Sequence, residues 1–411
     1  MIYQSVHKTI LPNGLTIVSE HIPYVRSISL GVWVKSGSRS ETPENNGVAH
    51  FLEHLLFKDT ERRSARDVVR NIESLGGMIN AYTSKEQTCF HVEILDEHLP
   101  QAVDVLADIL FRKGFPENEI EKEREVILDE IQSLEDTPDE LVQDILMEKL
   151  YPGHSLGFSI LGTEQSIAAL TLRELMNFYH AHYCPGNIII AAAGNLEHAR
   201  LVDLAQGSFS FSDQPCDSSV EAPRQYGKGE VRITRPINQA HVCLGMPAFS
   251  YSDPRKYDLL VLNTVLGAGM GSRLFQNIRE TYGIAYGIYS FFDFFSDNGM
   301  FGVYLGTDPK KVPRALELVE KELAVLCKRQ IPRQELQEAQ SQLKGNIVLG
   351  LESTAARMNR LAMLEIYFDG FKTIDYIVEA IDRTTRRSVW ETSCELFRPE
   401  NFLRVVFSPE G

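Results

Sequence analysis

The feature that most constrains the fold is an order of segments that occurs twice, on either side of a linker-like stretch. From about residue 208 to residue 229 the hydrophobic periodicity disappears and Ser, Asp, Pro and Gly dominate, a composition typical of linkers. Before and after this stretch, strand-like and helix-like segments follow one another in a similar order. We therefore predict two related halves, residues 1–210 and 230–411, joined by a linker at 211–229.

The correspondence between the two halves can be followed segment by segment. The predicted strands that correspond are 28–34 with 240–246 and 88–94 with 299–305. The predicted helices that correspond are the one around 50–57 with 259–266, 99–111 with 313–326, and 117–131 with 333–349. Strands followed by helices in each half predict an α+β fold, in which each half has a mostly antiparallel sheet covered by helices.

The first helix of the first half carries a pattern that its counterpart lacks. His50, Glu53 and His54 form an H-x-x-E-H sequence, preceded by Glu44-Asn45-Asn46 as an expected helix cap. Positions four apart lie about one turn from each other, so both imidazoles project from one face and suit a zinc ion. Glu53 is then placed to take a proton from metal-bound water. The alternative is an amphipathic helix with two incidental histidines.

Two histidines do not complete a catalytic zinc site, which usually has a third protein ligand. The predicted helix at 119–130 supplies many carboxylates. Helical periodicity alone does not select one of them.

Three motifs together resemble the pitrilysin-type (inverzincin, M16) zinc metallopeptidases: the pentad, Asn80-Ala-Tyr-Thr-Ser84, and Glu123-Arg-Glu-Val-Ile-Leu-Asp-Glu130. The resemblance extends over nearly the whole chain and is greatest to the β subunit of mitochondrial processing peptidase and its bacterial relatives. It implies that Glu130 is the third ligand of one Zn2+ per chain. It also implies that Glu123, two turns earlier on the same face, orients a ligand. A solvated acidic face remains the interpretation of Glu121, Glu125 and Asp129.

The resemblance further implies residues that contact a peptide substrate. Asn80 and Ala81 match a strand edge to which an extended peptide pairs. Phe57 matches a residue lining the pocket for the side chain just after the cleaved bond, although a core aromatic would look the same. Glu140 and Asp144 match an acidic pair that receives an arginine near the cut. Their alternative is an ordinary exposed helix face.

A segment of the second half also matches the family. Arg279 and Tyr286 correspond to residues that hold the substrate backbone and stabilise the oxyanion of the tetrahedral intermediate. The alternative is a helix that ends at Gly283, followed by a strand that begins at Tyr286. Both interpretations can hold together.

The resemblance implies a zinc-dependent endopeptidase of the M16B type that hydrolyses unfolded peptides or extended, presequence-like segments inside a closed chamber. The family encloses its zinc between two bowl-like halves, and a two-domain chain supplies one half of such a clamshell. We therefore expect a homodimer in which Arg279 and Tyr286 serve the zinc of the other subunit. The alternatives are a noncatalytic subunit on the same fold, which the complete metal motif disfavours, and a catalytic subunit that needs an inactive partner chain.

Composition argues against nucleic-acid-binding and membrane proteins. The formal net charge is −15 with dispersed acidic residues, which argues against nucleic acid as a partner. No apolar run approaches the roughly 20 residues of a membrane helix, and the N-terminus resembles neither a signal nor a transit peptide. We expect a cytoplasmic protein. Its six dispersed cysteines, without a C-x-x-C pair, are expected to be reduced thiols: Cys89, Cys184, Cys216, Cys243, Cys327 and Cys394.

Overall fold

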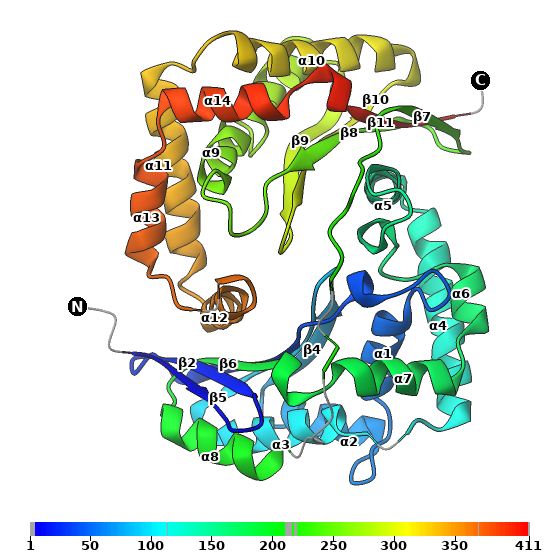
Figure 1. Ribbon diagram of the computed structural model, residues 1–411, viewed down its shortest axis with the longest axis vertical. Helices are drawn as coiled ribbons and strands as arrows, with labels where there is room; N and C mark the ends of the chain where they lie inside the picture. The colour runs from blue at the N-terminus through cyan, green and yellow to red at the C-terminus, as the bar shows by residue number, and fades with distance from the viewer. Residues whose placement is uncertain (1–4, 113, 210–215, 218–219, 369, 410–411) are drawn as a thin grey trace. The chain divides into compact units, whose positions relative to one another are not determined.

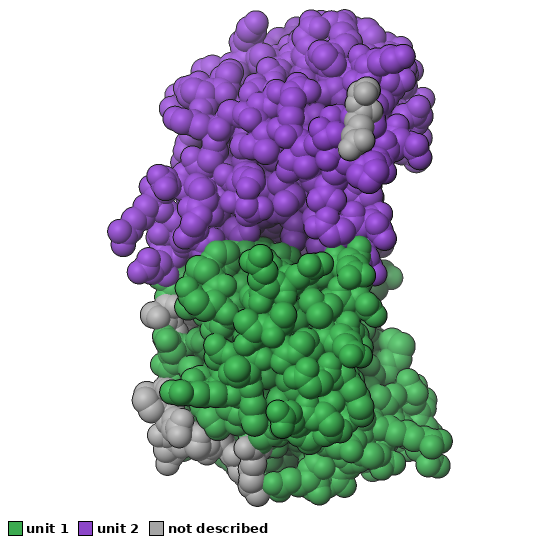
Figure 2. Space-filling view, turned by 90° about the vertical axis from the view of Figure 1, so that its right-hand side faces the viewer, with its two compact units in different colours: residues 1–132, 158–220, 350–371 green, residues 133–157, 221–349, 372–411 purple. Residues whose placement is uncertain are grey.

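The computed structural model describes residues 5–112, 114–209, 216–217, 220–368 and 370–409. Residues 211–215 and 218–219 of the expected linker therefore lie outside the described residues. The chain divides into two compact units, coloured separately in Figure 2. Unit 1 comprises residues 1–132, 158–220 and 350–371, and unit 2 comprises residues 133–157, 221–349 and 372–411.

Unit 1 contains one six-stranded sheet and its covering helices (Figure 1). Its strands are β1 (Val6–Ile10), β2 (Thr16–His21), β3 (Ser27–Val34), β4 (Met78–Thr83), β5 (Thr88–Leu95) and β6 (Ile188–Gly194). Its helices are α1 (Val48–Leu56), α2 (Ala65–Glu73), α3 (Leu99–Leu110), α4 (Glu117–Glu135, with its last turn across the unit boundary), α6 (Glu164–Ala169), α7 (Leu172–His182), α8 (His198–Ser208) and α12 (Thr354–Phe368). The strand order is β1-β2-β6-β3-β5-β4, so β4 forms one edge.

At the centre of the unit 1 sheet, both faces are buried. In β6, Ile188 and Ile190 belong to the main core, whereas Ile189 and Ala191 belong to a second core that includes Leu361 of α12. Figure 1 accordingly shows α12 on the opposite side of the sheet from α3 and α8. A strand covered on both faces has a continuous apolar sequence rather than an alternating one, which explains the composition of β6.

Unit 2 repeats this architecture with a five-stranded sheet. Its strands are β7 (Gly229–Thr234), β8 (Ala240–Ala248), β9 (Ala285–Phe294), β10 (Gly299–Thr307) and β11 (Leu403–Ser408). Its helices are α5 (Pro138–Leu150), α9 (Lys256–Leu266), α10 (Val312–Lys328), α11 (Arg333–Gly350), α13 (Ile374–Asp382) and α14 (Arg386–Leu396).

The five strands of the unit 2 sheet have the same topology as five of the six strands in unit 1. Unit 2 has the order β7-β11-β8-β10-β9, which matches β2-β6-β3-β5-β4 of unit 1 position by position. In both sheets the first of these pairs is parallel and the remaining pairs are antiparallel. The predicted fold of two similar α+β halves with mostly antiparallel sheets is confirmed.

Two helices belong to a different unit from their neighbours in the sequence. Helix α5 comes from the first half of the chain but packs on β8 and β11 of unit 2. Helix α12 comes from the second half but packs on β3 and β6 of unit 1. The compact units therefore differ from the contiguous ranges 1–210 and 230–411 at these two helices. An apolar helix face predicts burial against a sheet without indicating which of two similar sheets it covers.

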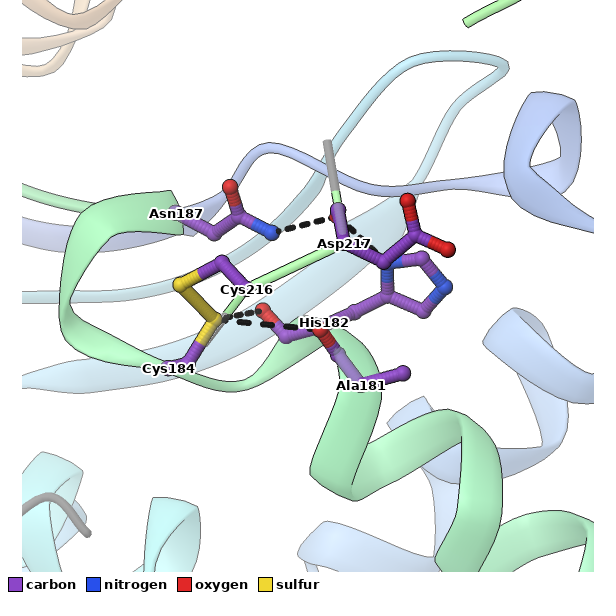
Figure 3. The surroundings of a disulfide bond; sticks show 6 residues. All are labelled: Ala181, His182, Cys184, Asn187, Cys216 and Asp217. Atoms are coloured by element: carbon purple, nitrogen blue, oxygen red, sulfur yellow. Dashed lines mark hydrogen bonds between the residues drawn. A yellow bond between two sulfur atoms is a disulfide. The ribbon is translucent and has the colours of Figure 1, made fainter. Parts of the chain in front are cut away.

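The expectation of six reduced cysteines is wrong for one pair. Cys184 and Cys216 form a disulfide, with their Cα atoms 5.7 Å apart (Figure 3). The next residue, Asp217, accepts hydrogen bonds through its carbonyl oxygen from Asn187 and from the ring of His182. A separation of 32 residues gave no sign of this proximity, because the chain between the two cysteines folds into β6 and α8 before it returns. The cysteines that remain free are Cys89, Cys243, Cys327 and Cys394.

The described helices also bear on the membrane question. None of them combines the length and the apolar character needed to cross a bilayer.

Candidate metal centre

A buried carboxylate fixes the start of the motif helix α1. The two Glu41 oxygens accept hydrogen bonds from the backbone N–H groups of Gly47 and Ala49, at 2.8 and 2.9 Å, and one also accepts from Asn46. These backbone groups belong to the first turn of a helix, where no intrahelical acceptor is present. The expected cap at Glu44-Asn45-Asn46 is therefore wrong in detail. Gly47 is the N-cap, with φ +92°, and Glu41 supplies the acceptors.

Three side chains from two helices converge beside this helix. His50 and His54 of α1 and Glu130 of α4 each offer a ligand atom within 4.8 Å of the others, and they are the one such group of three among the described residues. Each histidine Nε2 atom lies 3.6 Å from a different oxygen of Glu130. The Glu130 side chain is 40% exposed, so the cluster is open to molecules outside unit 1.

The cluster is compact enough for all three side chains to bind one metal ion. Two donors that each lie about 2.1 Å from one tetrahedral ion are roughly 3.4 Å apart, close to the observed nitrogen–oxygen separations. Burial, together with the neighbouring His54, lowers the pKa of His50 to about 3, so its imidazole is neutral and available as a ligand at neutral pH. Two imidazoles and one carboxylate form a donor set typical of catalytic zinc, in which a water molecule or the substrate takes the fourth position.

Glu53 lies on the same helix and is held by the neighbouring strand. Its Oε2 accepts a hydrogen bond of 2.5 Å from the hydroxyl of Thr83, at the end of β4. Burial raises the pKa of the Glu53 carboxyl, against the lowering effect of Thr83 and His54. A carboxyl group with a raised pKa beside a metal site is suited to accept and return a proton. The contact with Thr83 was not predicted, because it joins residues 30 positions apart.

A short chain of contacts supports the second histidine. His54 Nδ1 lies 3.1 Å from one oxygen of Glu123, and Lys58 Nζ lies 2.6 Å from the other. A carboxylate that accepts from the far nitrogen of a ligand histidine fixes its tautomer and ring orientation. Glu123 thus occupies the position expected of it, and Lys58 is a supporting residue that the sequence did not reveal. Three acidic residues of this helix face solvent, as expected: Glu121, Glu125 and Asp129.

Three predicted substrate-contacting residues lie close to the motif helix in unit 1. Asn80 and Ala81 are on β4, the edge strand that packs against α1. The Asn80 side chain accepts a hydrogen bond from the backbone N–H of Ala81. Phe57 ends α1 and is half-buried against the main core, with its ring centroid 6.1 Å from that of Phe90.

The remaining predicted site residues lie in unit 2. Glu140 and Asp144 are on α5, and Arg279 is in a π-helical segment, Phe275–Thr281. The Arg279 guanidinium lies over the ring of Phe275, 4.6 Å from its centroid. Tyr286 is on β9, the edge strand of its sheet, with 61% of its surface exposed.

Comparison with known proteins gives the family of the chain. A family model described as insulinase (peptidase family M16) matches residues 16–164, which include the whole cluster. A second model, described as the peptidase M16 inactive domain, matches residues 169–343. The chain belongs to peptidase family M16. The region that matches the first model lies in the first half of the chain and includes His50, His54 and Glu130. The region that matches the inactive domain lies mostly in the second half, which lacks the metal motif.

Relatives within M16 align along almost the whole chain. The zinc protease YmxG of Bacillus subtilis is 39% identical over 97% of both chains. The zinc protease SCO5738 of Streptomyces coelicolor is 41% identical over 98% of this chain and 89% of its own.

Solved structures agree on the fold. A protease from Helicobacter pylori superimposes with a TM-score of 0.92 over 98% of this chain and 99% of its own, at 21% identity. A structure from Pseudomonas fluorescens, described as a peptidase M16 inactive domain, gives a TM-score of 0.91 over 99% and 98%, also at 21% identity. The two-unit M16 fold is thus common to chains with few identical residues.

Proposed function

We propose that this M16 protein is a zinc-dependent endopeptidase that cleaves extended or unfolded peptides. The observation that carries the proposal is the convergence of His50, His54 and Glu130, with Glu53 beside them on the same helix. Relatives that bear the name zinc protease support the identity of the ion. His50, His54 and Glu130 would hold one Zn2+. A bound zinc ion would supply Lewis-acid chemistry, which polarises a carbonyl group and lowers the pKa of water.

Glu53 carries the proton in this proposal. Its carboxylate accepts a proton from the attacking water and then returns it to the leaving amine, so the residue ends the cycle unchanged. Thr83 occupies Oε2, which leaves Oε1 for this transfer. Glu123 and Lys58 keep His54 in the orientation needed to bind the ion.

Substrate recognition follows from the edge strand and its surroundings. An extended peptide would pair with β4 along Asn80 and Ala81, which gives affinity through main-chain hydrogen bonds. Phe57 would contact an apolar side chain just after the cleaved bond. Glu140 and Asp144 would attract an arginine of the substrate by charge.

We further propose that the active site is completed by a second copy of the chain. Arg279 and Tyr286 would contact the substrate backbone and stabilise the developing oxyanion. The exposed ring of Tyr286 is available for such a contact. In the homodimer, these residues of one subunit would serve the zinc of the other inside a closed chamber, which restricts substrates to unfolded segments.

Cleavage of a quenched peptide library by the purified protein tests these proposals. Wild-type protein should cut on the amino side of apolar residues, and a chelator should abolish the cutting. Glu53→Gln should retain zinc but lose hydrolysis, since the amide cannot accept the proton. Substantial activity of Glu53→Gln would refute the assigned role.

Dilution tests the shared site separately. Activity per chain should fall as the concentration passes below the dimer dissociation constant, and full activity of a monomer would refute the homodimer. Zinc binding without cleavage at any concentration would favour a catalytic subunit that needs a different partner chain.

A further inference from the structure

Thr83 lies outside the metal cluster and donates a hydrogen bond to the proposed base, Glu53. Its Oγ1 lies 2.5 Å from Glu53 Oε2, the length of a strong hydrogen bond to a carboxylate. The Thr83 side chain is half-buried at the end of β4, opposite Thr88 in the ladder with β5. The contact therefore joins the motif helix to the edge strand.

The hydroxyl protons of Thr83 and Thr88 each have an assigned acceptor. The Thr88 hydroxyl donates to the backbone oxygen of Ser36 at 3.0 Å, so its proton is already committed. Thr83 has a single hydroxyl proton, and Glu53 Oε2 at 2.5 Å is a much nearer acceptor than Thr88 Oγ1 at 3.5 Å. Thr83 is therefore the donor to Glu53.

We infer that Thr83 is a positioning residue for the reaction, which holds the Glu53 carboxylate in place relative to a peptide bound along β4. This inference rests on the proposed function. The peptide-pairing residues Asn80 and Ala81 and the hydroxyl that holds the base belong to one strand of six residues. The same strand would therefore position both the substrate carbonyl and Glu53, the group that accepts the proton. Displacement of a catalytic group by about 1 Å can cost on the order of 100-fold in rate.

Substitutions of the hydroxyl test the inference. Thr83→Val keeps the shape but removes the donor, Thr83→Ala removes it without adding bulk, and Thr83→Ser retains it. Ser84→Ala is the matched control, because the Ser84 hydroxyl belongs to the same hairpin but donates to the backbone oxygen of Gln87. The kinetic constants for a quenched peptide are measured for each variant, together with zinc affinity by chelator competition.

The expected pattern separates positioning from general structural damage. Thr83→Val and Thr83→Ala should lower kcat by about 10- to 100-fold while KM and zinc affinity change by less than about twofold. Thr83→Ser should retain most of kcat, and Ser84→Ala should resemble the wild type.

A double-mutant cycle on metal-free protein supplies a readout that does not depend on activity. The destabilisation by Thr83→Val should largely disappear in a Glu53→Ala background, whereas Ser84→Ala should cost the same in both backgrounds.

The contrary results distinguish failure of the inference from failure of the proposed function. Unchanged kcat in Thr83→Val and Thr83→Ala, loss of zinc affinity in both, or no coupling to Glu53 would each overturn the inference while the proposed function stands. Absence of cleavage by the zinc-loaded wild type at every concentration would overturn the proposed function, and with it the role of Thr83.

Discussion

At the scale of residues, the side-chain contacts of Glu123 with His54 and Lys58 predict an effect on metal affinity. Glu123 is buried, and both of its oxygens have partners, the imidazole at 3.1 Å and the ammonium at 2.6 Å. Glu123→Ala should weaken zinc binding by about 10- to 100-fold, because the histidine loses the group that fixes its orientation. Competition with a chromophoric chelator measures this change.

The exposed side of the same helix provides the control for that substitution. Glu125 is exposed, and Glu125→Ala should leave zinc affinity unaltered. Equal affinity of the Glu123→Ala and Glu125→Ala proteins would contradict the supporting role of Glu123. Lys58→Met should have a smaller effect in the same direction, because the carboxylate remains.

The buried Glu41 predicts a dependence of stability on pH. Burial raises its pKa from the usual 4.5 to about 7, although hydrogen bonds from Ala49, Gly47 and Asn46 oppose the shift. A carboxyl group whose folded pKa is raised stabilises the fold below pH 4.5, and this contribution is lost as the pH rises through 7. The free energy of unfolding of metal-free wild type, relative to Glu41→Gln, should fall by roughly 3 kcal/mol over this interval.

Urea unfolding at several pH values tests this prediction. Glu44→Gln is the control, because Glu44 is fully exposed and hydrogen bonding to Thr42 lowers its pKa. The wild type relative to Glu44→Gln should show no fall in stability between pH 4.5 and 7. A flat difference between the wild type and Glu41→Gln would indicate that the three donors outweigh burial.

These residues also mark how far the sequence could predict the site. The spacing of His50, Glu53 and His54 along a helix pointed to a metal site without any structure. Glu130 came from the family resemblance, since its helix carries many similar carboxylates. Glu41 and Thr83 were missed, because their roles arise from contacts with α1 that only the folded chain creates.

At the scale of elements, α12 closes the second face of the unit 1 sheet. Leu361 of this helix is 1% exposed and belongs to the same core as Trp33 of β3. Leu361→Ala should destabilise unit 1 by about 2–5 kcal/mol, the usual cost of truncating a buried leucine. Trp33 fluorescence in a Trp390→Phe background follows unfolding of this unit, because these are the two tryptophans of the chain.

The end of α11 supplies the matched comparison. Leu349 is 66% exposed, so Leu349→Ala should alter the unfolding free energy by less than about 0.5 kcal/mol. Similar losses in Leu361→Ala and Leu349→Ala would contradict the packing of α12 on this sheet.

The sequence predicted most elements and their correspondence, but not the unit to which each belongs. Periodicity identified the helix at 333–349 as the counterpart of 117–131, and the structure bears this out as α11 and α4. The packing of α5 on unit 2 and of α12 on unit 1 was not predicted, because the apolar patterns of both helices fit either sheet. Local sequence specifies an amphipathic surface, and the choice of partner depends on contacts between distant segments.

At the scale of the whole molecule, the disulfide predicts the oxidation state of the chain. Denatured, unreduced protein should expose four reactive thiols, and reduction should raise the number to six, because Cys184 and Cys216 are joined. Thiol titration, with peptide mapping of the 184–216 pair, measures this. Cys327→Ser should lower both numbers by one, which controls for incomplete labelling. Six thiols before reduction would show that the pair is not oxidised.

The exchange of α5 and α12 between the two units has a further consequence, for the evolutionary origin of the protein and for its behaviour when the chain is cut. If the chain is cut between residues 217 and 229, the first fragment carries α5, which unit 2 needs, and the second carries α12, which unit 1 needs. Neither fragment can cover the second face of its own sheet, so the two fragments are expected to bind each other by exchanging these helices. A single-unit ancestor that swapped this helix with a second copy would yield the present chain after tandem duplication of its gene.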